Sequence, residues 1–226
     1  RQKAKPKTEN ITSPTPRIEE EEPIKPLSQE RKAQLEEKVD TMMELSVGTR
    51  PLYLLDTYRF TADATVLSVQ KDANDPDDKV FHVICDATVF HPQGGGQPAD
   101  QGIIELKSSN AAGGFVKFAV NTVRKEADGT IVHIGSFVEP TQAALFDGTQ
   151  NLPCPASQHV SEEHRRLHAR LHSGGHILDA AMDAVFSNGE VDGVPQLRAT
   201  KGCHFPTASY VVVLPPIQPC VLALFN

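Results

Sequence analysis

Short segments in which apolar and polar residues alternate constrain the fold of this chain most strongly. The alternation is clear over residues 60–67 and returns at Val80, His82 and Ile84. A period of two is typical of a strand with one buried face, so each segment predicts a strand. Turn-forming Gly, Asn and Asp residues separate the segments, and the pattern therefore predicts a small β-barrel or sandwich. Further short strands are expected at 103–104, 115–120 and 131–134.

A longer period begins after residue 157. Ser161 is a good helix N-cap residue, and the spacing that follows predicts one long helix over about 162–186. Residues 141–157 are polar and contain proline, so we interpret them as a connector and as the domain boundary. The expected apolar stripe of the helix consists of Leu167, Leu171, Leu178, Met182 and Val185.

The first part of the chain has a different composition. Residues 1–27 are rich in Lys, Pro, Thr and Glu, and this composition predicts disorder. Apolar residues at helical spacing then predict a helix over 28–47, which either packs on the body of the protein or binds a partner. The chain begins with Arg1, so we expect that the natural start lies upstream.

Charge and composition exclude some classes of function. The net charge of −7 and the isoelectric point of about 5.7 disfavour a general nucleic-acid clamp, although they allow a local basic patch. The four cysteines show no C-x-x-C spacing, which favours a reducing intracellular setting. No apolar run reaches the length that crosses a membrane, and no membrane partner is expected.

The stretch HPQGGGQPADQG, residues 91–102, contains three consecutive glycines. Glycine has no side chain for a core and loses much entropy on ordering, so the run must serve the backbone. The N–H groups of Gly94, Gly95 and Gly96 could approach a ligand closely. The alternative is a tight structural turn.

The stretch HRRLHARLHSGGH contains histidines four residues apart: His164, His168, His172 and His176. Residues at this spacing share one face of a helix, so two imidazoles can bind one metal ion. The alternative is a row of solvated side chains. Gly174 and Gly175 interrupt the same helix, and each costs about 1 kcal/mol relative to Ala. They indicate the close approach of a ligand or a tight packing contact with the β region.

These stretches, in this order, resemble the editing domain of alanyl-tRNA synthetase and its free-standing relatives, the AlaX aminoacyl-tRNA deacylases. The resemblance rests on TVFHPQGGGQPADQG, RLHARLHSGGHIL and KGCHF, and it covers about residues 52–210. His91 stands where tyrosine is commoner, and Cys203 replaces an aromatic residue. The implied fold is α+β: a barrel domain over 48–145 with the GGGQ loop, then an α+β editing domain over 158–226 with the long histidine-bearing helix.

The resemblance implies an activity and a substrate. The reaction is hydrolysis of the ester that joins a wrong amino acid, Ser or Gly, to tRNA(Ala), and it implies a cytoplasmic protein. The implied pocket residues are Thr88 and Gln97 with Gly94, Gly95 and Gly96, and the implied metal pair is His172 and His176. Four cations could contact the acceptor end of the tRNA, unless they only form a solvated surface: Arg165, Arg166, Arg170 and Lys201.

One part of the family pattern is missing. The family binds Zn²⁺ with two further ligands in a C-x-x-x-H pattern after K-G-Y-H-F, and this chain has no such pattern. The chain therefore supplies two of four expected ligands, and we expect an incomplete editing domain with a replaced C-terminal portion. Three interpretations remain: an active trans-editing hydrolase, a non-catalytic tRNA- or protein-binding remnant, or a fragment of an alanine-tRNA ligase.

Overall fold

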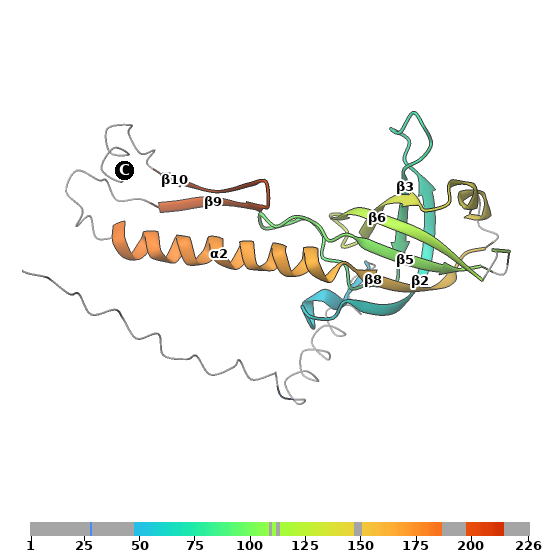
Figure 1. Ribbon diagram of the computed structural model, residues 1–226, viewed down its shortest axis with the longest axis horizontal. Helices are drawn as coiled ribbons and strands as arrows, with labels where there is room; N and C mark the ends of the chain where they lie inside the picture. Colours follow the sequence, from blue (N-terminus) through green and yellow to red (C-terminus); the bar gives the residue numbers. More distant parts are fainter. Residues whose placement is uncertain are drawn as a thin grey trace, which may run out of the picture.

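The computed structural model describes residues 28, 48–108, 110–111, 114–146, 151–186 and 198–214. The expected disorder over 1–27 and the expected helix over 29–47 lie outside the described residues, as does the end of the proposed editing domain after residue 214. Within the described part the chain is α+β, with a β-barrel at one end and a long helix beside a hairpin at the other (Figure 1).

Six antiparallel strands close into a barrel in the order β2-β3-β7-β6-β5-β8. Closure removes the unpaired edges that an open sheet would expose. The strands are β2 (Thr61–Lys71), β3 (Phe81–Cys85), β5 (Gly102–Lys107), β6 (Phe115–Lys125), β7 (Ile131–Phe137) and β8 (Cys154–Val160).

Short elements complete this end of the molecule. Strand β1 (Arg50–Pro51) pairs in parallel with β4 (Ala87–Thr88), and the 3₁₀ helix η1 (Leu52–Leu54) follows β1 directly. A second 3₁₀ helix, η2 (Pro140–Phe146), connects β7 toward β8 and buries Phe146. The Phe146 ring stacks on Phe137 with the centroids 5.7 Å apart.

The barrel core forms where alternating side chains point inward. In β2 the buried residues are Ala62 and Val66, as the sequence pattern predicted. In β3 the inward residues are Phe81, Val83 and Cys85, and the set at 80, 82 and 84 faces outward. Both sets of β3 are largely apolar, so the alternation alone did not fix which face is buried.

The expected connector over 141–157 differs from the structure. This stretch contains η2 and the first half of β8, and β8 pairs with both β2 and β5 to close the barrel. Its buried residues do alternate, but Pro155 and the polar run 157–159 concealed the pattern. The barrel therefore extends to Val160, beyond the expected end at residue 145.

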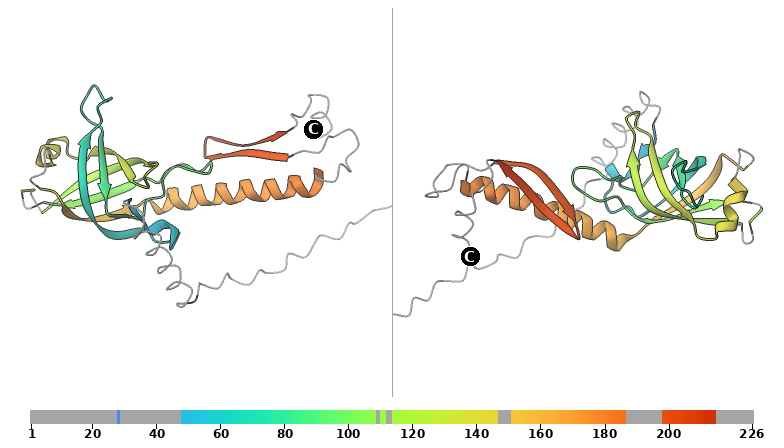
Figure 2. Two further views of the ribbon diagram at one scale, coloured as in Figure 1. Left: turned by 180° about the vertical axis from the view of Figure 1, so that it is seen from behind. Right: turned by 90° about the horizontal axis from the view of Figure 1, so that it is seen from above.

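Helix α2 (Glu162–Phe186) leaves the barrel directly after β8 and has the bounds that the sequence predicted. A hairpin of β9 (Arg198–Phe205) and β10 (Ala208–Leu214) lies along it (Figures 1 and 2). We call α2, β9 and β10 the arm. Among the described residues, none of the helices is both long enough and apolar enough to cross a membrane.

The expected apolar stripe of α2 is largely uncovered within the described part of the chain. Leu167, Leu178 and Val185 are 41, 49 and 51% exposed, while Leu171 and Met182 are half-buried. The buried residues of α2 are instead Arg165 and His168, near its start. The arm thus contacts the barrel through polar side chains, and its apolar face is mostly open.

Candidate functional site

The three glycines form a tight turn between β4 and β5. Gly94 and Gln97 exchange backbone hydrogen bonds of 3.2 and 2.9 Å across the turn. Gly95 and Gly96 have φ angles of 56° and 81°, a left-handed conformation that favours glycine. A Cβ on Gly96 would also lie 2.5 Å from the carbonyl oxygen of Gly202 in β9. The tight turn, one of the two alternatives for the glycine run, therefore explains Gly95. At Gly96 the close approach of β9 also requires glycine.

The turn faces the histidines of α2. His172 Nδ1 lies 2.8 Å from Gln97 Oε1, and its Nε2 lies 2.9 Å from His176 Nε2. A Cβ on Gly95 would come within 3.7 Å of the His172 ring. Two elements that are far apart in the sequence thus meet at one place, as the motif order predicted.

A third histidine completes the cluster, and the sequence interpretation did not assign it a role. The His204 N–H donates to the Gly96 carbonyl at 2.8 Å. Its ring stacks on His172 with centroids 4.9 Å apart and is almost fully buried. The signal was present, because His204 lies in the KGCHF stretch that carried the resemblance. We call His172, His176 and His204 the histidine cluster.

The paired glycines of α2 have different roles. A Cβ on Gly175 would lie 2.0 Å from His204 Cε1, whereas a Cβ on Gly174 would meet nothing within 4 Å. Gly175 therefore makes room for the His204 ring. The close contact is therefore with β9 of the arm and involves Gly175 alone, whereas the packing alternative expected from the sequence placed the pair against the barrel strands.

The surroundings of His172 favour its neutral form. Burial lowers the pKa of His172, and the neighbouring His176 and His204 lower it further. The amide oxygen of Gln97 can only accept, so His172 Nδ1–H donates to it. The Nε2 lone pair of His172 then points toward His176.

The fit of this cluster to zinc is partial. Two imidazole nitrogens at this separation suit a shared metal ion, but zinc in proteins takes four ligands, or three and a water. In the part of the chain that the structure describes, no group of three or more His, Cys, Asp and Glu side chains could hold a metal ion. The described residues do not make a complete zinc site.

Thr88 lies on β4, which is not a barrel strand, and its side chain contacts strand β7 of the barrel. Its hydroxyl is fully buried, pairs with His133 Nε2 at 2.7 Å and accepts the Phe90 N–H at 3.0 Å. His133 is itself fully buried, and its Nδ1 donates to the Val83 carbonyl at 3.0 Å. Burial lowers the pKa of His133 to about 4, so the ring is neutral. A contact between Thr88 and a substrate stays a prediction.

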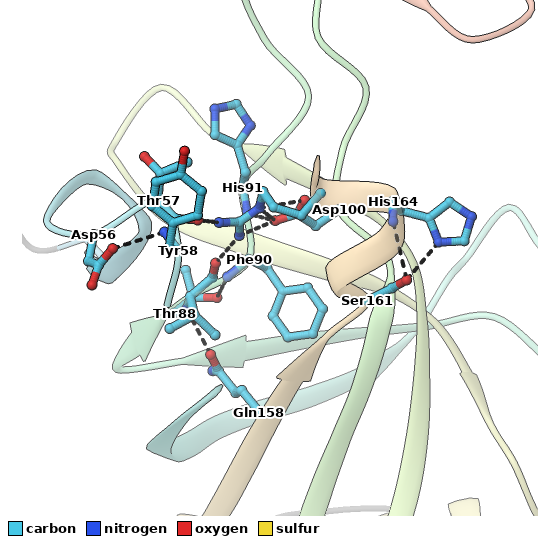
Figure 3. A network of polar contacts seen from close by, with 12 residues as sticks. Asp56, Thr57, Tyr58, Thr88, Phe90, His91, Asp100, Gln158, Ser161 and His164 are labelled. Carbon is cyan, nitrogen blue, oxygen red and sulfur yellow. Dashed lines mark hydrogen bonds and ion pairs between the residues drawn. The ribbon is translucent and has the colours of Figure 1, made fainter. Parts of the chain in front are cut away.

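The expected tRNA-binding arginine Arg165 lies in a buried ion pair. Its Nε donates to both oxygens of Asp100, at 2.9 and 2.8 Å, and its Nη atoms donate to the carbonyls of Thr57 and Val89. Asp100 also accepts the His91 N–H at 2.5 Å (Figure 3). The Arg165 side chain is only 2% exposed, so it fastens the helix to the loop and offers no surface to a phosphate.

The other expected cations are exposed. Arg166 pairs with Glu162 at 2.7 Å and lies over the rings of Tyr58 and Phe60. Arg170 and Lys201 are also exposed. Two cations that the sequence interpretation missed, Arg124 and Lys125 at the end of β6, line a cavity of about 330 Å³. The glycine turn forms the other side of this cavity, with Gly94, Gly96 and Gln97.

The chain has sequence relatives among known proteins. No protein-family model matches the chain. An alanine-tRNA ligase of Caldivirga maquilingensis is 29% identical over 154 residues, which are 68% of this chain and 14% of that protein. The alanyl-tRNA editing protein AlaX-L of Pyrococcus horikoshii is 29% identical over 140 residues, 60% of this chain and 28% of that protein. AlaX-M of the same organism is 27% identical over 178 residues, 79% of this chain and 68% of that protein.

The candidate site thus joins a glycine turn beside a small barrel to histidines on a helix. The relatives support an AlaX-like editing domain over most of the chain, as the motifs predicted. The chain spans only 14 and 28% of the ligase and of AlaX-L.

Proposed function

We propose that the chain is a trans-editing aminoacyl-tRNA deacylase that hydrolyses the ester of seryl- or glycyl-tRNA(Ala). One observation carries this proposal: the Gln97–His172 contact of 2.8 Å, which joins the glycine turn to the histidine cluster. Two of the relatives are alanyl-tRNA editing proteins, which supports tRNA(Ala) as the substrate class. We further propose that the activity is cytoplasmic.

The backbone of the turn is proposed to hold the ester carbonyl. Hydrolysis of an ester develops negative charge on the carbonyl oxygen, and preorganised N–H donors stabilise that charge. The hydrogen bonds of the turn use the N–H groups of Gly94 and Gln97. We therefore assign the N–H groups of Gly95 and Gly96 to the carbonyl oxygen, and Gly94 to the turn that orients them.

His172 is proposed to act beside that carbonyl. Gln97 fixes the ring by accepting from Nδ1, and this leaves Nε2 unprotonated. A neutral imidazole can bind a metal or accept a proton from water. We propose Zn²⁺ as the metal of the His172–His176 pair, which supplies two of the four expected ligands. When bound, zinc supplies Lewis-acid polarisation.

Substrate selectivity is proposed to involve Thr88 with Gln97. A site that pairs with a substrate hydroxyl rejects the analogue without one by about 10⁴–10⁵-fold, so the seryl ester would be preferred over the alanyl ester. This selection applies to serine alone, because glycine also lacks the hydroxyl. Thr88→Val keeps the shape and removes the hydroxyl. We expect it to reduce the preference for seryl- over alanyl-tRNA(Ala). An unchanged ratio would limit Thr88 to its structural bonds with His133 and Phe90.

The tRNA acceptor end is proposed to lie along the exposed cations. Arg124 and Lys125 border the glycine turn, and Arg166, Arg170 and Lys201 are exposed on the arm. Such side chains bind phosphates without reading sequence, so their neutralisation should weaken binding most at low salt.

The central experiment is deacylation of seryl-, glycyl- and alanyl-tRNA(Ala) by the purified chain, together with its zinc content. We expect hydrolysis of the first two, and its loss in His172→Ala and His176→Ala. The matched control is His159→Ala, because His159 is an exposed histidine on β8, outside the cluster. Activity that survives both cluster substitutions would refute the proposal.

A second candidate is supported by the partial fit to zinc. The described residues supply no group of three metal ligands, which favours a domain that binds tRNA or a protein without hydrolysis. RNA binding without bound zinc or deacylation would support this candidate. The chain could also correspond to one piece of an alanine-tRNA ligase, since it spans 14 and 15% of two such ligases.

A further inference from the structure

A second cavity lies beside the candidate site. It has a volume of about 310 Å³, at the small end of the range for ligand pockets. Its walls come from the flanks of the glycine turn, from β6, from the first two turns of α2 and from the β9–β10 turn. The side chains that matter here are Gln93, Gln101, Asn121, His164, His168 and Phe205.

This cavity borders the one beside the glycine turn, because Gln93 and Phe205 line both. The two differ in charge. The first is lined by Arg124, Lys125 and Glu126, two cations and one carboxylate, whereas the described lining of the second contains no Asp, Glu, Lys or Arg. A ligand that spans both would therefore place an anionic group near the turn and a neutral group in the second cavity.

The second cavity offers hydrogen-bonding groups of both kinds. Gln101 and Asn121 are exposed amides, and each amide can donate and accept. His168 is 6% exposed, and its Nδ1 has no hydrogen-bond partner among the described residues. Burial lowers the pKa of His168 and favours its neutral form. The walls thus combine neutral polar groups with the flat surfaces of Phe205 and the imidazoles.

We propose that this cavity binds an unpaired nucleobase of the single-stranded RNA end, adjacent to the nucleotide that carries the ester. The inference rests on the proposed function, because it takes the glycine turn as the site of the ester. A base stacks on an aromatic or imidazole face, and its edge pairs with amide side chains. A phosphate would favour the neighbouring cavity with its two cations, and an ammonium group would need a carboxylate that this described lining lacks.

The test is a binding cycle that needs no hydrolysis. The probe is an RNA hairpin that has a short single-stranded 3′ end and carries no amino acid. It is compared with the same hairpin in which one unpaired base is removed to leave an abasic sugar. The proteins are the full chain, the double variant Gln101→Ala/Asn121→Ala, and the control Gln70→Ala. Gln70 is likewise an exposed amide on the barrel but lies outside both cavities.

We expect removal of one particular base to weaken binding to the full chain and to Gln70→Ala by about tenfold. The double variant should bind the intact hairpin about tenfold more weakly, and it should lose little more when the base is removed. Such coupling is the signature of a direct contact. Equal losses for intact and abasic hairpins, or no effect of any base removal, would overturn the inference.

The outcome is separable from that of the proposed function. Coupling measured with RNA that carries no amino acid, together with no deacylation of any substrate, would support the base site and refute the deacylase. Deacylation that depends on His172, without coupling at Gln101 and Asn121, would support the deacylase and refute the base site.

Discussion

The barrel and the arm are stabilised in different ways. The barrel buries a continuous set of apolar residues, with Val66, Ile104 and Phe118 fully inaccessible. The buried side chains of α2 are Arg165 and His168, and that of β9 is His204. The candidate site lies where the two regions meet. The geometry of the site therefore depends on a few polar contacts, while the barrel that supports it depends on apolar packing.

The largest expected effect comes from breaking the main polar contact between the two regions. Arg165→Met leaves Asp100 buried without its cation, and removal of one partner of a buried ion pair costs about 3–5 kcal/mol. Urea unfolding followed by circular dichroism measures this loss.

The neighbouring arginine provides the matched control. Arg166 forms an exposed pair with Glu162, and such pairs contribute about 0–1 kcal/mol. Arg166→Met should therefore leave the midpoint of unfolding almost unchanged. Similar losses for the two variants would show that the Asp100–Arg165 contact does not fasten the arm.

One leucine in each region allows a direct comparison of how much apolar packing contributes to stability. Leu106 is fully buried in the barrel, so Leu106→Ala should destabilise the chain by about 2–5 kcal/mol. Leu178 is 49% exposed on the arm, and Leu178→Ala should change stability by less than about 0.5 kcal/mol. Thermal unfolding of both variants checks the pair. A large loss for Leu178→Ala would mean that residues outside the described part cover the arm.

The sequence predicted the elements of the site better than their attachment. The bounds of α2 followed from local spacing, and the meeting of His172 with the glycine turn followed from the family resemblance. The roles of Arg165 and Arg166 did not, because the two residues are adjacent and chemically equal. Only the position of Asp100, distant in the chain, decides which arginine is buried.

The same limit applies to strands and glycines. In β3 both alternating sets are largely apolar, so the sequence pattern did not show which of the two sets faces the core. For α2, sequence reasoning showed that Gly174 and Gly175 are unusual, but the packing of β9 on α2 is needed to place His204 against one of them. Long-range contacts, which no local pattern contains, supplied the missing information in both cases.

The barrel should also weaken in acid through His133. Burial lowers its pKa to about 4 from 6.5, so the unfolded chain binds more protons between these values. The free energy of unfolding should therefore fall by about 3 kcal/mol from this group as the pH drops from 7 to 4. Urea unfolding across this range measures the slope.

His133→Gln is the matched variant for that slope. Its amide can still donate to the Val83 carbonyl and accept from Thr88, but it does not titrate. Its stability should depend less on pH than that of the full chain, whatever its stability at pH 7. Equal slopes would contradict a neutral, buried His133.

The smallest effects are expected where the arm packs on itself, at the two adjacent glycines of α2. Ala is a better helix former than Gly by about 1 kcal/mol, so Gly174→Ala should stabilise α2 without touching any neighbour. In Gly175→Ala the new methyl group would lie 2.0 Å from His204 Cε1, and such overpacking costs about 1–3 kcal/mol.

The two glycine substitutions are expected to affect the arm differently and to leave the barrel unchanged. They therefore test the packing of the arm alone. Gly175→Ala should displace the His204 ring from His172 and weaken the bond from the His204 N–H to the Gly96 carbonyl, now 2.8 Å. Imidazole NMR signals and hydrogen exchange at the His204 amide would report both changes, and barrel amides should keep their protection. If Gly174→Ala produced the same shifts, the histidine cluster would not depend on the space at Gly175. The attachment of β9 to the helix would then need a different explanation.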